Sequence, residues 1–190
     1  MEKHKSIKIE KFLDGDKIYL RRLDISDIEI YADSGVNMDL ESRIFTGTVG
    51  VFTKSQSEKY INSIMSDSSR IDFLIISKED NSIVGEVVLN DINRNSRNSN
   101  IRIAIFEGEN FGKGYGTEAM ILALDYGFGM FNLHRIDLTV YDFNERGIHV
   151  YEKIGFKREG VLRDYLYFNH NYYDAIVMSI LEDEFRESHL

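Results

Sequence analysis

The hydrophobic positions of this chain follow two periods, one typical of strands and one typical of helices. Residues 17–23 alternate between apolar and polar side chains, as a half-buried strand does. Residues 70–77 are rich in β-branched side chains and lie between polar turns, which also predicts a strand. In all, seven strands are expected, over 17–23, 70–77, 82–92, 101–106, 135–141, 155–168 and 172–182.

A period of about 3.6 residues marks the helices. Apolar side chains recur three and four positions apart between Met120 and Phe131, which predicts a helix with one buried face. Asn144 is expected to cap a shorter helix that ends at Gly155, where glycine can take the left-handed conformation. Two more helices are expected over 26–36 and 53–66, and a hairpin loop over 93–100.

The order of these elements is β-α-α-β-β-β-α-β-α-β-β. Strands and helices that alternate in this way predict an α/β (α+β) chain, with a mixed sheet of about seven strands flanked by helices. The chain has 190 residues, close to the usual size of one domain, and nothing in it resembles an interdomain linker. We therefore expect a single domain over residues 1–190.

Composition narrows the class of protein. The chain is 43% apolar and 29% charged, which is typical of a soluble globular protein. Its net charge of −9 argues against a general nucleic-acid binder, because phosphate affinity comes from clustered Lys and Arg. The sequence has no cysteine, and therefore no disulfide, thiolate metal site or thiol nucleophile.

Targeting signals are not evident in the sequence. No apolar run reaches the ~18–20 residues of a membrane span. The first residues, MEKHKSIKIEKFL, lack the apolar block and the cleavage site of a secretory signal. These features predict a cytoplasmic protein that binds neither membranes nor nucleic acids.

Acidic residues are concentrated in one segment. Between Asp24 and Ser42 there are six acidic residues and no basic one: Asp24, Asp27, Glu29, Asp33, Asp39 and Glu41. Such a run is either the solvated face of a helix or a negative field that gathers a cationic substrate.

The segment ENFGKGYGTEAM, residues 109–120, carries a glycine at every second position before a predicted helix. Gly112, Gly114 and Gly116 leave the main-chain N–H groups open at the start of that helix, an arrangement that binds phosphate. A Walker A loop would need a lysine before Thr117, and a Rossmann fingerprint would need G-x-G-x-x-G spacing; the segment has neither. A tight turn without a ligand is the remaining alternative.

This loop resembles the acetyl-CoA pyrophosphate loop of the GNAT superfamily of N-acetyltransferases, whose pattern is R/Q-x-x-G-x-G/A. Gly114 and Gly116 match the two small positions, whereas Phe111 stands where Arg or Gln is usual. A second segment, residues 140–160, resembles the family pattern N-x-x-A-x-x-x-Y-x-K-x-G-F. Its matching residues, with glycine in place of alanine, are Asn144, Gly147, Tyr151, Lys153, Gly155 and Phe156.

The closing segment NYYDAIVMSIL, residues 171–181, is similar to the end of the ribosomal-protein N-terminal acetyltransferase branch. The spermidine acetyltransferases share most of the same segments. The resemblance covers roughly residues 17–182 and implies the GNAT fold, a mostly antiparallel sheet splayed between the fourth and fifth predicted strands. It also leaves open a homodimer or a larger homo-oligomer.

The resemblance further implies that acetyl-CoA binds as a co-substrate, without a metal ion. Its pantetheine arm would fill the splay and contact the main chain of the fourth predicted strand, and its pyrophosphate would bind the amides of the glycine loop. The residues implied are Ile103, Ile105, Phe111, Gly112, Lys113, Gly114, Tyr115, Gly116, Thr117, Asn144, Gly147 and Tyr151.

Two residues are candidates for acid–base chemistry. The resemblance implies Tyr151 as the general acid for the coenzyme A thiolate, a role that suits a phenol with a pKa of ~10. Glu86 interrupts the apolar run IVGEVVL and is the candidate base that would take a proton from the ammonium form of the acceptor. Asp91 or a water molecule is the alternative base.

The sequence therefore predicts an N-acetyltransferase that moves an acetyl group from acetyl-CoA to a primary amine by direct attack. The resemblance to the ribosomal-protein branch favours the α-amine of a protein N-terminus as acceptor. A polyamine such as spermidine or spermine is the alternative, favoured by the acidic segment; both acceptors are cationic. A different alternative is a non-catalytic module that binds acyl-CoA.

Overall fold

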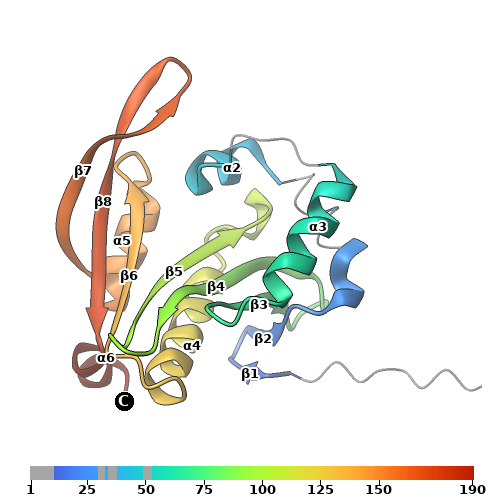
Figure 1. The fold of residues 1–190 in the computed structure, drawn as a ribbon, viewed down its shortest axis with the longest axis horizontal. Helices are drawn as coiled ribbons and strands as arrows, with labels where there is room; N and C mark the ends of the chain where they lie inside the picture. Colours follow the sequence, from blue (N-terminus) through green and yellow to red (C-terminus); the bar gives the residue numbers. More distant parts are fainter. Residues whose placement is uncertain (1–10, 30–32, 34–37, 49–52) are drawn as a thin grey trace, which may run out of the picture.

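The computed structural model describes residues 11–29, 33, 38–48 and 53–190. Its strands are β1 (Leu13–Asp14), β2 (Ile18–Arg22), β3 (Ile71–Ser77), β4 (Ile83–Asn93), β5 (Asn98–Ile105), β6 (Arg135–Tyr141), β7 (Lys157–Phe168) and β8 (Asn171–Leu181). They form one eight-stranded sheet of order β1-β2-β3-β4-β5-β6-β8-β7 (Figure 1). Neighbouring strands are antiparallel except for β5 and β6, which are parallel.

Helices cover both faces of the central strands (Figure 1). Because side chains alternate along a strand, each strand contributes to two cores. One core packs on α4 (Tyr115–Gly129) and includes Leu89 and Leu124. The other packs on α3 (Lys54–Met65) and includes Ile61 and Leu74. The remaining helical segments are η1 (Ile25–Asp27), α2 (Leu40–Thr46), η2 (Gly108–Asn110), α5 (Glu145–Ile154) and α6 (Glu182–His189).

The predicted fold class is confirmed, and the strand count differs by one. The sheet has eight strands rather than about seven, because β1 pairs with β2 and its two residues are too few to show a period. The hairpin loop predicted over 93–100 is shorter, since β4 runs to Asn93 and β5 begins at Asn98. The helix predicted over 26–36 lies partly outside the described residues, and η1 overlaps its start.

Two helices, α2 and α6, are absent from the sequence prediction. In α2 the hydroxyl of Ser42 donates to the main-chain carbonyl of Ile105 at 2.8 Å. In α6 the ring of Phe185 is buried against Phe128 of α4, with centroids 5.4 Å apart. Both helices depend on contacts with residues far away in the sequence, which a local period does not reveal.

The sheet forks between β5 and β6, as predicted for the fourth and fifth predicted strands (Figure 1). The two strands pair only over Asn98 to Asn100 and Arg135 to Asp137, and then diverge. At the last pair, the side-chain amide of Asn100 donates to Asp137 Oδ1 at 3.1 Å. This hydrogen bond lies at the vertex of the fork.

The main chain of β5 presents to the fork groups that do not bond to β4, and one of them, Ile105 O, accepts from Ser42 Oγ. The amide of Phe106 donates to Val84 O at 3.1 Å, so the even-numbered residues of β5 bond to β4. The main-chain groups of Ile103 and Ile105 therefore face away from β4, toward the gap. The geometry provides a row of donors and acceptors along one wall of the fork.

Candidate active site

A cavity of about 370 Å³ occupies the fork, and we call it the fork cavity. It brings together the glycine loop, β5 and α5. All of the predicted cofactor-binding residues except Lys113 line it: Ile103, Ile105, Phe111, Gly112, Gly114, Tyr115, Gly116, Thr117, Asn144, Gly147 and Tyr151.

The glycine loop forms an open cradle at the start of α4. Gly112 and Gly114 have φ angles of 74° and 90°, which side chains rarely tolerate. A Cβ at Gly112 would meet nothing within 4 Å, and the N-terminus of α4 has no side-chain cap. Open N–H groups at a helix N-terminus attract anions. The loop therefore fits the pyrophosphate of acetyl-CoA.

Contacts from the turn between β1 and β2 support this cradle. The ammonium of Lys17 donates to the main-chain carbonyl of Lys113 at 2.9 Å. The carboxylate of Glu118 accepts from the main-chain amides of Asp16 and Lys17. A trans peptide points its C=O and N–H in opposite directions, so Lys17 aims the N–H of Gly114 away from β2.

Lys113 does not line the fork cavity with its side chain. Its ammonium donates to Asn110 Oδ1 at 3.1 Å instead. A different cation, Arg146 of α5, lines the cavity and stacks on the ring of Phe111, 3.9 Å from its centroid. Arg146 thus brings a guanidinium to the loop position where the family pattern has Arg or Gln.

Asn144 combines a structural role with its place on the cavity wall. Its Oδ1 accepts from the amide of Gly147 at 2.9 Å and caps α5. A Cβ at Gly147 would lie 2.7 Å from the Asn144 side-chain nitrogen, which explains why glycine suits this position. Asn144 is buried as a result.

Tyr151 lies two helical turns after Asn144 on α5. Burial raises the pKa of its phenol to about 12, although its side chain still borders open space. The phenol therefore stays protonated at neutral pH. Its ring packs edge-on against Phe156, with centroids 6.0 Å apart.

A second cavity, of about 390 Å³, is lined by residues of β4, β5 and β6, and we call it the β4 cavity. Glu86, Asp91 and Arg102 contribute charged groups to its lining, and Tyr165 of β7 lies on the opposite wall. Asn144 and Tyr151 line both cavities. A reactive group in the fork cavity can therefore meet a second molecule in the β4 cavity at Tyr151.

The two candidate bases have different surroundings in this cavity. Glu86 is buried, 6% exposed, and its Oε1 accepts from Arg102 Nη2 at 3.0 Å. Asp91 is exposed, in the left-handed conformation with a φ of 54°, and accepts from the side-chain amide of Asn90 at 3.1 Å. Glu86 is thus fixed, and Asp91 is open to solvent.

None of the acidic residues of the segment Asp24–Ser42 lines either cavity. Asp27 forms a buried ion pair with Arg21, and Glu29 and Glu41 pair with Lys54 and Arg146. Asp24 accepts from the amide of Ser26 and Asp39 from that of Gly108. These five acids make structural contacts, so the interpretation as a substrate-gathering field finds no support in their positions.

Sequence reasoning missed several residues of the two cavities. Arg146 falls within the predicted motif segment, where its charge was a usable signal, and Lys153 was named there only as a motif residue without a role. Phe45 and Thr46 of α2, which line both cavities, belong to no sequence motif, and neither does Tyr165.

In the described ranges, no group of three or more His, Cys, Asp or Glu is arranged to hold a metal ion. Nor is any helix there long and apolar enough to cross a membrane.

A forked sheet with an open glycine loop at one cavity and carboxylates at the other fits an acyl-CoA-dependent acyltransferase. A family model described as an acetyltransferase (GNAT) domain matches residues 17–157. The chain therefore belongs to the GNAT acetyltransferase family. It is an N-acetyltransferase that uses acetyl-CoA, which confirms the predicted enzyme class and co-substrate.

Relatives cover nearly the whole chain. The uncharacterized N-acetyltransferase YokL of Bacillus subtilis is 29% identical over 92% of this chain and 96% of its own length. The spermidine N(1)-acetyltransferase of Vibrio cholerae is 30% identical over 89% of this chain and 95% of its own length. A crystal structure of spermidine N-acetyltransferase from that organism, with CoA and spermine, has a TM-score of 0.82 at 27% identity, covering 90% of this chain and 99% of its own.

Proposed function

We propose that the acceptor is a linear polyamine, such as spermidine, and that the enzyme acetylates one of its primary amines by direct attack. The observation that carries the proposal is the β4 cavity, which meets the fork cavity at Tyr151 and bears the carboxylates of Glu86 and Asp91. Similarity to a spermidine acetyltransferase over nearly the whole chain supports the same acceptor. The sequence favoured the α-amine of a protein N-terminus as acceptor, whereas the relatives favour a polyamine, which was the alternative.

In this proposal the fork cavity binds acetyl-CoA, which supplies the activated thioester. The amides from Gly112 to Thr117 bind the pyrophosphate, and Arg146, beside Phe111, adds a positive charge. The main chain of Ile103 and Ile105 faces the fork and binds the pantetheine arm. Asn144 and Gly147 form the wall on the α5 side.

Tyr151 is the proposed general acid. Its raised pKa keeps a proton on the phenol oxygen, which it can donate to the leaving thiolate. Its place between the two cavities puts that proton beside both molecules.

Glu86 is the proposed base, directly or through a water molecule. The ion pair with Arg102 holds its carboxylate against the wall of the β4 cavity, where an acceptor ammonium would lie. Asp91, exposed in the same cavity, is the proposed anchor for a second ammonium of the polyamine and the alternative base.

The first test measures thiol release from acetyl-CoA with spermidine, spermine and short peptides with free N-termini. We expect turnover with the polyamines, and expect Glu86→Gln to lower kcat/KM by about 10²–10⁴. Asp183→Asn, which removes an exposed carboxylate of α6, is the matched control. Turnover with peptides alone would overturn the acceptor, and silence with tight acetyl-CoA binding would favour a non-catalytic module.

A further inference from the structure

A smaller cavity lies beside the β4 cavity and shares two residues with it. It measures about 170 Å³, and we call it the side cavity; it is lined by Asp67, Ser69, Arg70, Asn90, Asp91 and Arg102. Asp91 and Arg102 also line the β4 cavity. Arg102 therefore stands between the two spaces.

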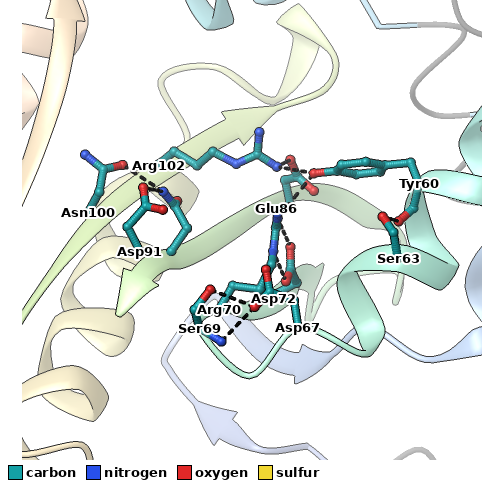
Figure 2. Close-up of polar contacts among 11 residues, drawn as sticks. Tyr60, Ser63, Asp67, Ser69, Arg70, Asp72, Glu86, Asp91, Asn100 and Arg102 are labelled. Atoms are coloured by element: carbon teal, nitrogen blue, oxygen red, sulfur yellow. Dashed lines mark hydrogen bonds and ion pairs between the residues drawn. The ribbon is translucent and has the colours of Figure 1, made fainter. Parts of the chain in front are cut away.

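Two hydrogen bonds hold Arg102 in this position (Figure 2). Its Nη2 donates to Glu86 Oε1 at 3.0 Å and to the phenol oxygen of Tyr60 at 3.2 Å. Exposed ion pairs are weak, but here the carboxylate partner is buried and the phenol adds a second contact. The guanidinium is thus a fixed part of the wall.

A second arginine, Arg70, also bonds to Tyr60, which lies on α3 (Figure 2). Arg70 Nη2 donates to the same phenol oxygen at 3.2 Å. Arg70 also binds Asp72 through two hydrogen bonds of 2.9 and 2.6 Å. One phenol therefore bridges two arginines, each paired with a buried carboxylate.

Strand register places these groups on one face of the sheet. Asp72 of β3 lies opposite Val88 of β4, and Val88 lies opposite Arg102 of β5. Glu86 is two residues from Val88 and shares its face, diagonal to Arg102. The position of Arg102 is therefore determined by the sheet as well as by its side-chain partners.

The side cavity has groups that suit an ammonium ion. Asp67 and Asp91 contribute carboxylates. The side-chain oxygen of Asn90 is buried, and within the described part of the chain no donor reaches it. A buried oxygen without a donor is costly, and an ammonium N–H would satisfy it.

We propose that Arg102 determines which amines the enzyme accepts, by closing the acceptor cavity with a fixed positive charge. This inference rests on the proposed function. A short polyamine can pair its ammoniums with the carboxylates of Glu86 and Asp91, which offset the charge of the guanidinium beside Glu86. A longer one must bring a further ammonium to the guanidinium, where like charges repel. Loss of that charge would let the amine extend into the side cavity.

The test compares kcat/KM for spermine with kcat/KM for spermidine. In Arg102→Gln we expect the spermine-to-spermidine ratio to rise about tenfold, because the repulsion is lost. Tyr60→Phe removes the hydrogen bond between the phenol and Arg102 and should raise the ratio less. Arg102→Lys keeps the charge and should keep the ratio near that of the wild type. Lys59→Gln, which removes an exposed cation of α3 next to Tyr60, is the matched control and should leave the ratio unchanged.

Calorimetric titration of spermine into the CoA-bound protein provides a readout besides turnover, and its affinity should rise in Arg102→Gln. An unchanged ratio in a variant that folds and binds CoA would overturn the inference and leave the proposed function standing. If Arg102→Gln does not fold, an unchanged ratio in Tyr60→Phe overturns it. A wild-type enzyme inactive with both amines would overturn the proposed function and the inference with it.

Discussion

Asn100 and Asp137 form the last residue pair between β5 and β6, and a hydrogen bond of 3.1 Å joins their side chains at the vertex of the fork. Beyond this pair the strands diverge, and Asn100 itself lines the β4 cavity. Asn100 also accepts from the side-chain amide of Asn90 at 3.3 Å. The vertex is therefore tied to both β4 and β6.

Asn100→Ala should lower the free energy of unfolding by about 1–2 kcal/mol, because it leaves two partly buried polar partners without their bond. Urea denaturation measures this change. Asn62→Ala, which removes an exposed side-chain bond to Glu58 O within α3, is the control and should cost less. Equal losses would show that the vertex bond has no special structural role.

Tyr151→Phe should lower kcat by about 10²–10⁴ and leave the Kd of acetyl-CoA nearly unchanged. The phenyl ring keeps its packing against Phe156, and only the proton donor is lost. Steady-state kinetics and calorimetry give the two quantities. A variant with wild-type kcat would remove the general-acid role.

The raised pKa of Tyr151 also predicts a loss of stability in alkali. The phenol titrates at about 12 in the folded protein and at ~10 when unfolded, so above pH ~10 the unfolded state loses its proton first. The stability from this group is complete below pH ~10 and is lost as pH rises through about 12. Thermal denaturation between pH 9 and 11 should show a smaller decline in Tyr151→Phe than in the wild type.

Gly114→Glu should abolish acetyl-CoA binding, because it adds a negative charge to the lining of the phosphate cradle and its Cβ would lie 3.2 Å from Lys17 Nζ, which orients the loop. Gly114→Ala carries the strain of the φ of 90° without the charge and should weaken binding only in part. Gly129→Ala, where a Cβ meets nothing within 4 Å, is the neutral control. If Gly114→Glu retained its affinity for coenzyme A, the hypothesis that the glycine loop binds the pyrophosphate would be wrong.

Lys17→Met should weaken acetyl-CoA binding by about 1 kcal/mol, roughly fivefold, because the Lys113–Gly114 peptide loses the bond that orients it. Lys113→Met should weaken binding less, since its ammonium is directed at Asn110. Calorimetry with coenzyme A compares the two variants. The reverse order would show that Lys113 is the phosphate ligand.

Local signals were enough to predict several elements of this enzyme. Residues 135–141 match β6, and Asn144 and Gly155 bound α5 as expected. The glycine loop was also recognisable, because positive φ angles at closely spaced positions require glycine. These features depend on neighbours a few residues apart, so a pattern in the sequence contains them.

Other features exist only in the folded chain. Lys17 reaches the glycine loop across 96 residues, and Tyr60 meets Arg102 across 42. Glu86 was a candidate from its place in an apolar strand, but its ion pair with Arg102 follows from the register of β4 and β5. By itself the sequence determined most of the helices and strands and the glycine loop, through periodicity, capping and backbone conformation. The tertiary structure decided which charges meet across strands, because register and helix packing act between residues that no local pattern connects.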